Sequence, residues 1–395
     1  MVDSVVKEEN GIINDDITNV KSDQIIEPTV AQKEHKLGIF EKYLALWVAI
    51  CMGIGILLSQ FVPVIGDTLN SWTVYNINIP IGICLFFMMY PALLNLQLKE
   101  VKKLGKNPTP VILALVSNWL IAPLVAAGLG YLIIRNISNL ELDDQNQLIT
   151  AVILLGSSPC TAMVLVWGSL AKGNQEQNVI NTSINTVTII FLYVPIVKFL
   201  TGIQDIDIPW VWLLISVSLF IGIPLILGLA SKEVLTKTKG KEWFVNKYRP
   251  VVGKISMVAL LITLIVLFAI NGQVLISNPI ELLVVSAPLL LGFIIVVGLN
   301  LLITKLFRLK YREAIITTII GSSSHFEIAI ATAIGLFGVG SMAALGTTMG
   351  LFWEVPIMLV LVYLGKFLAK KGFWKSKEDE KKLLTKQNSE GNFNP

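Results

Sequence analysis

Charged residues are scarce in this sequence. Only 15% of its 395 residues are Asp, Glu, Lys or Arg, whereas 54% are hydrophobic, and the mean hydropathy is +0.71. Soluble globular domains contain about 25% charged residues, so a composition this apolar excludes a water-soluble globule of this length. The sequence therefore predicts an integral membrane protein.

Cysteine is also rare, and the motifs of several enzyme classes are missing. Cys51, Cys84 and Cys160 all fall inside apolar segments, where a disulfide framework is not expected, so we interpret them as free thiols. No GxxxxGK[ST] motif is present, so drive by ATP would need a separate subunit. The stretch 325–327 lacks the HExxH spacing of a zinc protease, and no nucleophile and base occur at a recognisable spacing. We predict that the protein is not an enzyme and has no cofactor.

Ten apolar stretches are long enough to cross a bilayer as helices. About 20 apolar residues span a hydrocarbon core about 30 Å thick, and helices satisfy their own backbone hydrogen bonds in lipid. The predicted fold class is therefore an all-α membrane protein with ten spans. These are residues 43–62, 79–98, 110–134, 148–171, 178–201, 209–230, 251–271, 281–304, 313–337 and 342–369.

Lysine and arginine are nearly absent from one set of connections between these spans. Residues 67–76, 136–145, 204–207 and 271–277 contain neither, and Arg135 is the only basic residue beside them. The basic connections are residues 99–107, 172, 231–249 and 305–312 and the tail from residue 366. Because basic loops stay on the cytoplasmic side, both termini are predicted to be cytoplasmic in a cell-membrane protein. The net charge of +4 follows from this topology and indicates no nucleic-acid partner.

Two stretches of the sequence resemble each other. GSSPCTAMVLVWGSLAKG (156–173) and GSSSHFEIAIATAIGLFG (321–338) share their first three residues, and Val-Pro-Ile recurs in the following spans at 194–196 and 355–357. Five spans per copy is an odd number, so the second copy would enter the membrane from the opposite side. Such inverted repeats are typical of transporters. Chance similarity between two apolar segments is the alternative.

This repeat sets the predicted domain organisation. The first five-helix repeat covers residues 41–201 and the second covers residues 202–371. Residues 1–40 are polar, mix both signs of charge and lack the pattern of a cleavable signal, so we interpret them as a disordered cytoplasmic extension. Residues 372–395 form the predicted cytoplasmic tail.

Glycine, serine and proline in the middle of spans four and nine predict breaks in both helices. Broken helices are tolerated in membranes only where the backbone lines a cavity or is buried in protein. The two discontinuous helices are therefore expected to cross near the bilayer centre. Their freed amide groups and half-helix N-termini would favour anionic ligand atoms there.

Cys160 follows the first predicted break. A thiol binds soft centres, and a helix N-terminus favours its thiolate form. A buried packing residue is the alternative interpretation.

Three ionisable residues lie at membrane depth in the second repeat. A carboxyl there costs about 3 kcal/mol or more, so Glu327 is a candidate proton carrier; a protonated carboxyl bonded to a neighbouring helix is the alternative. His325 could bind an oxyanion or share that proton, or be a satisfied polar residue. Glu354 could take part in transport or form a fixed hydrogen bond across the break. Asn118 and Asn185 could form hydrogen bonds between helices or bind a ligand.

The quoted repeat and three further motifs resemble a known family. IPIGICLFFMMYPALLNL (79–96), SNWLIAPL (117–124) and EVPIMLVLVY (354–363), together with the broken-helix motifs, are similar to the arsenite efflux permeases of the third arsenical-resistance type. These permeases belong to the bile acid sodium symporter superfamily. The resemblance implies crossed, broken helices four and nine, a functional cysteine at Cys160 and a functional glutamate at Glu327. The chain departs from the pattern at Ser324 and His325, where many relatives carry asparagine.

The resemblance also implies a substrate and a mechanism. Trivalent arsenic, sometimes also antimonite, would be exported in exchange for protons, which are favoured over sodium, or under the membrane potential, and would confer arsenic resistance. Cys160 would contact arsenic, and the hydroxyls of Ser157, Ser158, Ser322 and Ser323 would contact its oxygens. The alternatives are a sodium-coupled symporter of an organic anion and, from another class, a passive channel or a receptor. Whether the protein forms a homo-oligomer is left open.

Overall fold

The computed structural model describes residues 43–74, 77–94, 108–136, 140–161, 163–277 and 279–374. The predicted extension at residues 1–40 and the predicted tail beyond residue 374 lie outside the described residues. Within them, the chain is helical apart from one hairpin of two-residue antiparallel strands. In this hairpin β1 (Thr73–Val74) pairs with β2 (Ile77–Asn78).

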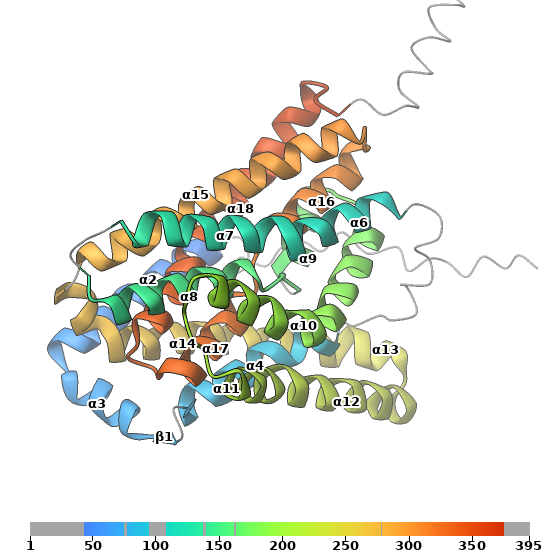
Figure 1. Cartoon of the computed structure of the whole chain (residues 1–395). Coiled ribbons are helices and arrows are strands. Elements are labelled where there is room, and N and C mark those ends of the chain that lie inside the picture. Colours follow the sequence, from blue (N-terminus) through green and yellow to red (C-terminus); the bar gives the residue numbers. More distant parts are fainter. Residues whose placement is uncertain are drawn as a thin grey trace, which may run out of the picture. The chain divides into compact units, whose positions relative to one another are not determined.

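The helices follow the apolar stretches of the sequence (Figure 1). In chain order they are α2 (Leu44–Phe61), α3 (Pro63–Ser71), α4 (Ile79–Leu94), α6 (Thr109–Val116), η2 (Ser117–Ile121), α7 (Ala122–Leu129), η3 (Gly130–Ile134), α8 (Leu142–Gly156), α9 (Met163–Leu170), α10 (Gln175–Ile203), α11 (Trp210–Val217), η4 (Ser218–Gly222), α12 (Ile223–Lys239), α13 (Lys241–Trp243), η5 (Phe244–Tyr248), α14 (Arg249–Ser277), α15 (Pro279–Leu306), α16 (Tyr311–Ser322), α17 (Phe326–Phe337) and α18 (Met342–Lys370).

Wide π-helical turns, labelled η, continue the neighbouring α-helices without a gap. Two of them, η2 and η4, end two residues before a proline, Pro123 and Pro224 respectively. Because proline has no amide donor and crowds the preceding turn, it disturbs the regular helical hydrogen bonds at that point. The helices widen there instead of ending.

Six of the described helices are long and apolar enough to cross a membrane. They are Thr109–Ile134, Gln175–Ile203, Trp210–Lys239, Lys241–Ile270, Val284–Leu306 and Met342–Lys370. Large apolar side chains such as Phe191 on α10 and Val360 on α18 are 68% and 64% exposed, as expected for surfaces that face lipid. The prediction of an all-α membrane protein is confirmed at this level. The ten-span inverted repeat stays a prediction.

The two interruptions expected from the sequence are present. The helix α8 ends at Gly156 and α9 begins at Met163, while α16 ends at Ser322 and α17 begins at Phe326. Each interrupted pair is followed by a 29-residue helix, α10 or α18, with an internal proline, Pro195 or Pro356. The predicted repeat and the local structure therefore correspond at these positions.

The helices of residues 43–374 form two groups by their contacts. In the first group, α14 packs against α2 and α4, and α4 packs against α12. In the second group, α8 packs against α7 and α18, and α15 packs against α7, α16 and α18. Figure 1 shows α4 beside α12 in the lower part of the view and α15 beside α18 in the upper part. Each group thus combines helices from both halves of the chain.

A glycine allows the closest approach inside the first group. A Cβ atom at Gly55 of α2 would lie 2.8 Å from the Ile265 carbonyl oxygen of α14. Only glycine fits this contact, and small residues of this kind let membrane helices pack backbone against backbone.

Candidate functional site

The two breaks pass each other in antiparallel orientation. Pro159 and Ser324 form an isolated β-bridge. The Cys160 backbone N–H donates to the Ser323 carbonyl (3.3 Å), and the His325 backbone N–H donates to the Ser158 carbonyl (2.6 Å). Each break therefore satisfies backbone groups that the other leaves open, as a break inside a membrane requires.

The end of α16 is held by two polar side chains from neighbouring helices. Ser117 Oγ donates to the Gly321 carbonyl at 2.7 Å. Asn300 Nδ2 lies within hydrogen-bonding distance of the same carbonyl (3.1 Å) and of the hydroxyl oxygens of Ser117 (2.8 Å) and Ser322 (3.1 Å). The last carbonyls of any helix lack partners within the helix, so these donors stabilise the break. Neither residue was predicted as functional from the sequence, although an asparagine inside the apolar span 281–304 was a usable signal.

A pair of asparagines supports the first break. Asn185 Nδ2 on α10 donates to the Cys160 carbonyl (3.3 Å), and Asn118 Nδ2 donates to Asn185 Oδ1 (3.2 Å). The helix-to-helix hydrogen bond is therefore present, and a role of Asn118 in ligand binding stays a prediction. Together they fix the backbone that carries the Cys160 thiol.

Glu354 on α18 accepts three hydrogen bonds from the second break. Its Oε1 accepts from Ser323 Oγ (2.5 Å) and the Ser324 backbone N–H (3.0 Å), and its Oε2 accepts from Ser324 Oγ (2.7 Å). The side chain is only 1% exposed. The fixed hydrogen bond across the break is therefore present, and a direct role in transport stays a prediction.

His325 and Glu327 contact each other at the start of α17. His325 Nδ1 lies 2.8 Å from Glu327 Oε2, and both side chains are buried. His325 occupies the N-cap position and Glu327 lies in the first turn. The positive end of the helix dipole favours negative charge there.

The Cys160 thiol lies at the centre of these groups. It lies close to the Ser323 side chain and the Val164 backbone, and near the carboxyl groups of Glu354 and Glu327. Cys160 is 2% exposed, so it is not open to solvent in this conformation. The structure thus brings one thiol and two carboxyl groups into a single buried cluster.

The predicted serines have different surroundings. Ser158 Oγ donates to the Leu155 carbonyl (2.9 Å), whereas Ser157 Oγ is buried and has no hydrogen-bond partner among the described residues. A buried hydroxyl without a partner is unfavourable. Ser157 is fully buried and does not line the cavity described below.

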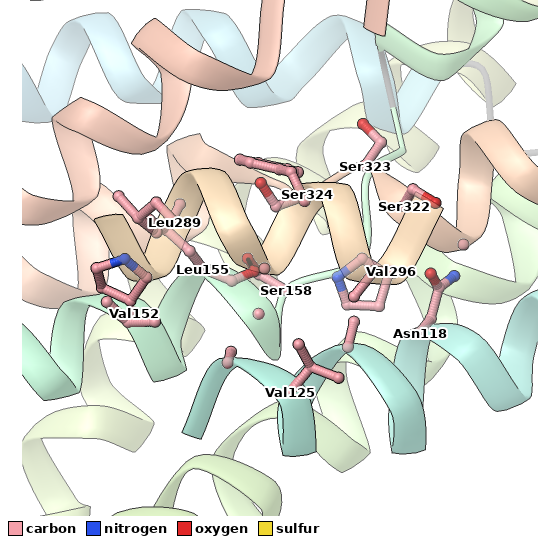
Figure 2. Close-up of a pocket in the computed structure, with 18 residues that line it drawn as sticks. Asn118, Val125, Val152, Leu155, Ser158, Leu289, Val296, Ser322, Ser323 and Ser324 are labelled. Carbon is pink, nitrogen blue, oxygen red and sulfur yellow. Dashed lines mark hydrogen bonds between the residues drawn. The ribbon is translucent and has the colours of Figure 1, made fainter. Parts of the chain in front are cut away.

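A cavity of about 60 Å³ lies beside the crossing (Figure 2). Its polar side chains are Asn118, Ser158, Ser322, Ser323 and Ser324. The other walls come from α7, α8 and α15 and are apolar. Neither Cys160 nor Glu327 lines this cavity. Among the described residues no group of three or more His, Cys, Asp or Glu side chains could hold a metal ion.

Comparisons with known proteins identify similar sequences along nearly the whole chain. Residues 82–278 match the family model described as the Sodium Bile acid symporter family. An uncharacterized transporter of Synechocystis is 40% identical over 370 residues, covering 91% of this chain and 96% of that protein. The arsenical-resistance protein Acr3 of Alkaliphilus metalliredigens is 36% identical over 330 residues, covering 82% and 92%. Its counterpart from Corynebacterium glutamicum is 29% identical over 350 residues, covering 86% and 92%.

Proposed function

The chain belongs to the sodium bile acid symporter family, and from this premise we propose that it is a secondary transporter that exports trivalent arsenic from the cytoplasm. It is a multi-pass membrane protein and a transporter, not an enzyme. Two relatives that cover most of this chain bear the name arsenical-resistance protein. We propose the same substrate here, with antimonite as a second substrate.

The observation that carries this proposal is the buried cluster at the crossing of the two breaks. Trivalent arsenic is thiophilic and bears oxygens, so it needs a soft ligand next to hydrogen-bonding groups. The Cys160 thiol supplies the first, and the unpartnered Ser157 hydroxyl supplies the second. In our mechanism Cys160 contacts arsenic, and Ser157, Ser158, Ser322 and Ser323 contact its hydroxyl groups.

Glu327 is the proton carrier in this mechanism. Its carboxyl group is 7% exposed and already bonded to His325, which can share the proton. Glu354 is occupied by three donors and is therefore assigned to hold the break. Neutral arsenous acid leaving against one entering proton moves one charge inward, which is worth about 2.3 kcal/mol per 100 mV. Export against a gradient then needs no ATP.

The two helix groups suggest how the site changes sides. If the group containing both breaks moves against α2, α4, α12 and α14, the site opens to each side in turn. We propose that this movement acts on a ten-span inverted repeat in the cell membrane with both termini in the cytoplasm.

The test is flux of As(III) into everted membrane vesicles under an imposed proton gradient and membrane potential. Uphill, uncoupler-sensitive accumulation is expected from the intact protein and is expected to be lost in Cys160→Ala and Glu327→Gln. Cys51→Ala is the matched control, because Cys51 is also buried but lies on α2. Flux that only follows the arsenic gradient would contradict active export and indicate a channel.

A sodium gradient is the second candidate for the driving force, because the matching family model is named for sodium symport. The same vesicles distinguish the two ions. A sodium gradient imposed at constant pH and zero potential should have no effect on proton-driven flux. Sodium-dependent flux that survives Glu327→Gln would replace the proton in the mechanism.

A further inference from the structure

Three hydroxyl groups join α4, α12 and η5 away from the crossing of the breaks. Tyr90 Oη lies 2.5 Å from Ser231 Oγ and 2.9 Å from Tyr248 Oη. The buried side chains of Leu94 and Phe244 form an apolar cluster against which both tyrosines pack. The three helical segments are therefore held in fixed positions relative to one another.

Two basic residues directly follow two of these hydroxyls in the sequence. Lys232 follows Ser231, and Arg249 follows Tyr248. Both basic side chains are half-buried, and they lie close enough for their charges to repel each other. Within the part of the chain that the structure describes, Arg249 makes no ion pair. Half-buried like charges side by side are unfavourable, so an anion bound between them would be stabilised.

The charge around this pair is also positive. Residues 231–249 contain six basic and two acidic residues. One of the two acidic residues, Glu233, is already paired with Lys237 at 2.7 Å. Lys241 and Lys247 are exposed and add to the positive potential. An anion is therefore attracted to this side of the protein.

The pair lies at the boundary between a basic segment and an apolar surface. The rings of Trp243 and Tyr248 are stacked, with centroids 5.9 Å apart, and these two residue types are enriched where a membrane meets water. Further along α14, Val258 and Ile262 are 53% and 45% exposed, as expected for side chains that face lipid. Arg249 is therefore placed at the depth of the lipid head groups.

We propose that Lys232 and Arg249 bind the phosphate group of an anionic membrane lipid. The planar guanidinium group can donate two parallel hydrogen bonds to phosphate oxygens, and the lysine adds a point charge. The acyl chains then lie along the exposed apolar side of α14. This site is independent of the transported substrate. It joins three segments of the first helix group, so a bound lipid ties that group to one surface of the membrane.

The test uses the full chain, purified in detergent micelles that contain phosphatidylcholine and titrated with phosphatidylglycerol. Native mass spectrometry gives the dissociation constant of the first bound phosphatidylglycerol. Arg249→Gln should raise this constant by about 10- to 100-fold, because a charge-assisted hydrogen-bonding partner is lost. Lys247→Gln is the matched control. It removes the same charge from an exposed residue two positions earlier and should raise the constant by at most about fivefold. Equal effects of the two substitutions would overturn the proposal.

Two further measurements separate a lipid site from a site for free phosphate and from a folding defect. Millimolar inorganic phosphate should not displace phosphatidylglycerol, and displacement that depends on Arg249 would overturn the assignment to a lipid. Arg249→Lys keeps the positive charge and should bring binding back to within about tenfold of the intact protein. Binding that stays lost in Arg249→Lys, at an unchanged melting temperature without phosphatidylglycerol, would also overturn the proposal.

Discussion

Replacement of Glu354 by alanine is expected to destabilise the crossing of the two breaks by about 3–5 kcal/mol. The buried carboxyl group accepts from Ser323 Oγ, Ser324 Oγ and the Ser324 backbone N–H. A hydrogen bond to a charged group contributes about 1.5–3 kcal/mol. Both hydroxyls can turn to other acceptors, but the backbone N–H cannot, so the loss is smaller than the sum of three bonds.

Glutamine at the same position should be much milder. Its Oε1 can still accept from Ser323 and from the Ser324 backbone, and its amide can donate to the Ser324 hydroxyl once that hydroxyl turns. The substitution removes the negative charge and reverses the direction of the hydrogen bond with the Ser324 hydroxyl. We expect a destabilisation of about 1–2 kcal/mol.

Thermal unfolding of the purified protein, followed by tryptophan fluorescence, measures the difference. At roughly 2 °C per kcal/mol, Glu354→Ala should melt about 6–10 °C below the intact protein and Glu354→Gln about 2–4 °C below. Glu354→Gln should also retain As(III) flux. Equal melting temperatures for the two variants would refute the hydrogen-bond reasoning. A folded Glu354→Gln protein without flux would show that the charge of Glu354 takes part in the transport cycle.

Three further predictions concern the surroundings of the crossing. Asn300→Ala removes the Asn300 donor from the end of α16 and should destabilise the protein by about 2–3 kcal/mol, measured by the same melting assay. Gly156→Ala places a Cβ atom 2.3 Å from Ala126 Cβ, so it should force α7 and α8 apart and lower the yield of folded protein. Gly292→Ala should not lower the yield, because a Cβ atom there lies 3.7 Å from its nearest neighbour. Cys160, which is 2% exposed, should react with maleimide only slowly at rest and faster under an imposed proton gradient; an equally fast reaction at rest would contradict its burial.

Hydropathy located the helices because burial in lipid demands long apolar stretches with internally satisfied backbones. It was less accurate at their ends. The fourth predicted span begins at residue 148, but α8 begins at Leu142, since its first turn contains Asp143 and Asp144. Those residues are polar yet favourable at a helix N-terminus, which a hydropathy window does not register.

The residues of the candidate site could be predicted from the sequence, but most of their hydrogen-bond partners could not. Polar residues inside apolar spans stand out in the sequence, so Glu327 and Glu354 could be selected by depth. Cys160 was distinguished from Cys51 and Cys84 by its place at a predicted break. Their partners depend on which helices meet. The sequence indicated a hydrogen bond of Glu354 across the break as one alternative, but not that Ser324 is a donor to it or that Asn300 holds Gly321. The cavity was not predictable either, because α15 lies far along the chain from α7 and α8, which form its other walls.

The pairing of the breaks limits which movements can carry a substrate across. The N–H groups of Cys160 and His325 find their acceptors only in the opposite break. If the two breaks moved apart in a region without water, both N–H donors would lose their acceptors, at a cost of about 1–3 kcal/mol each. The hydrogen bonds that Glu354 accepts would add to this cost. Movement of the whole second helix group breaks none of these bonds. Transport is therefore favoured when the crossing stays intact and the contacts that change are those with α2, α4, α12 and α14.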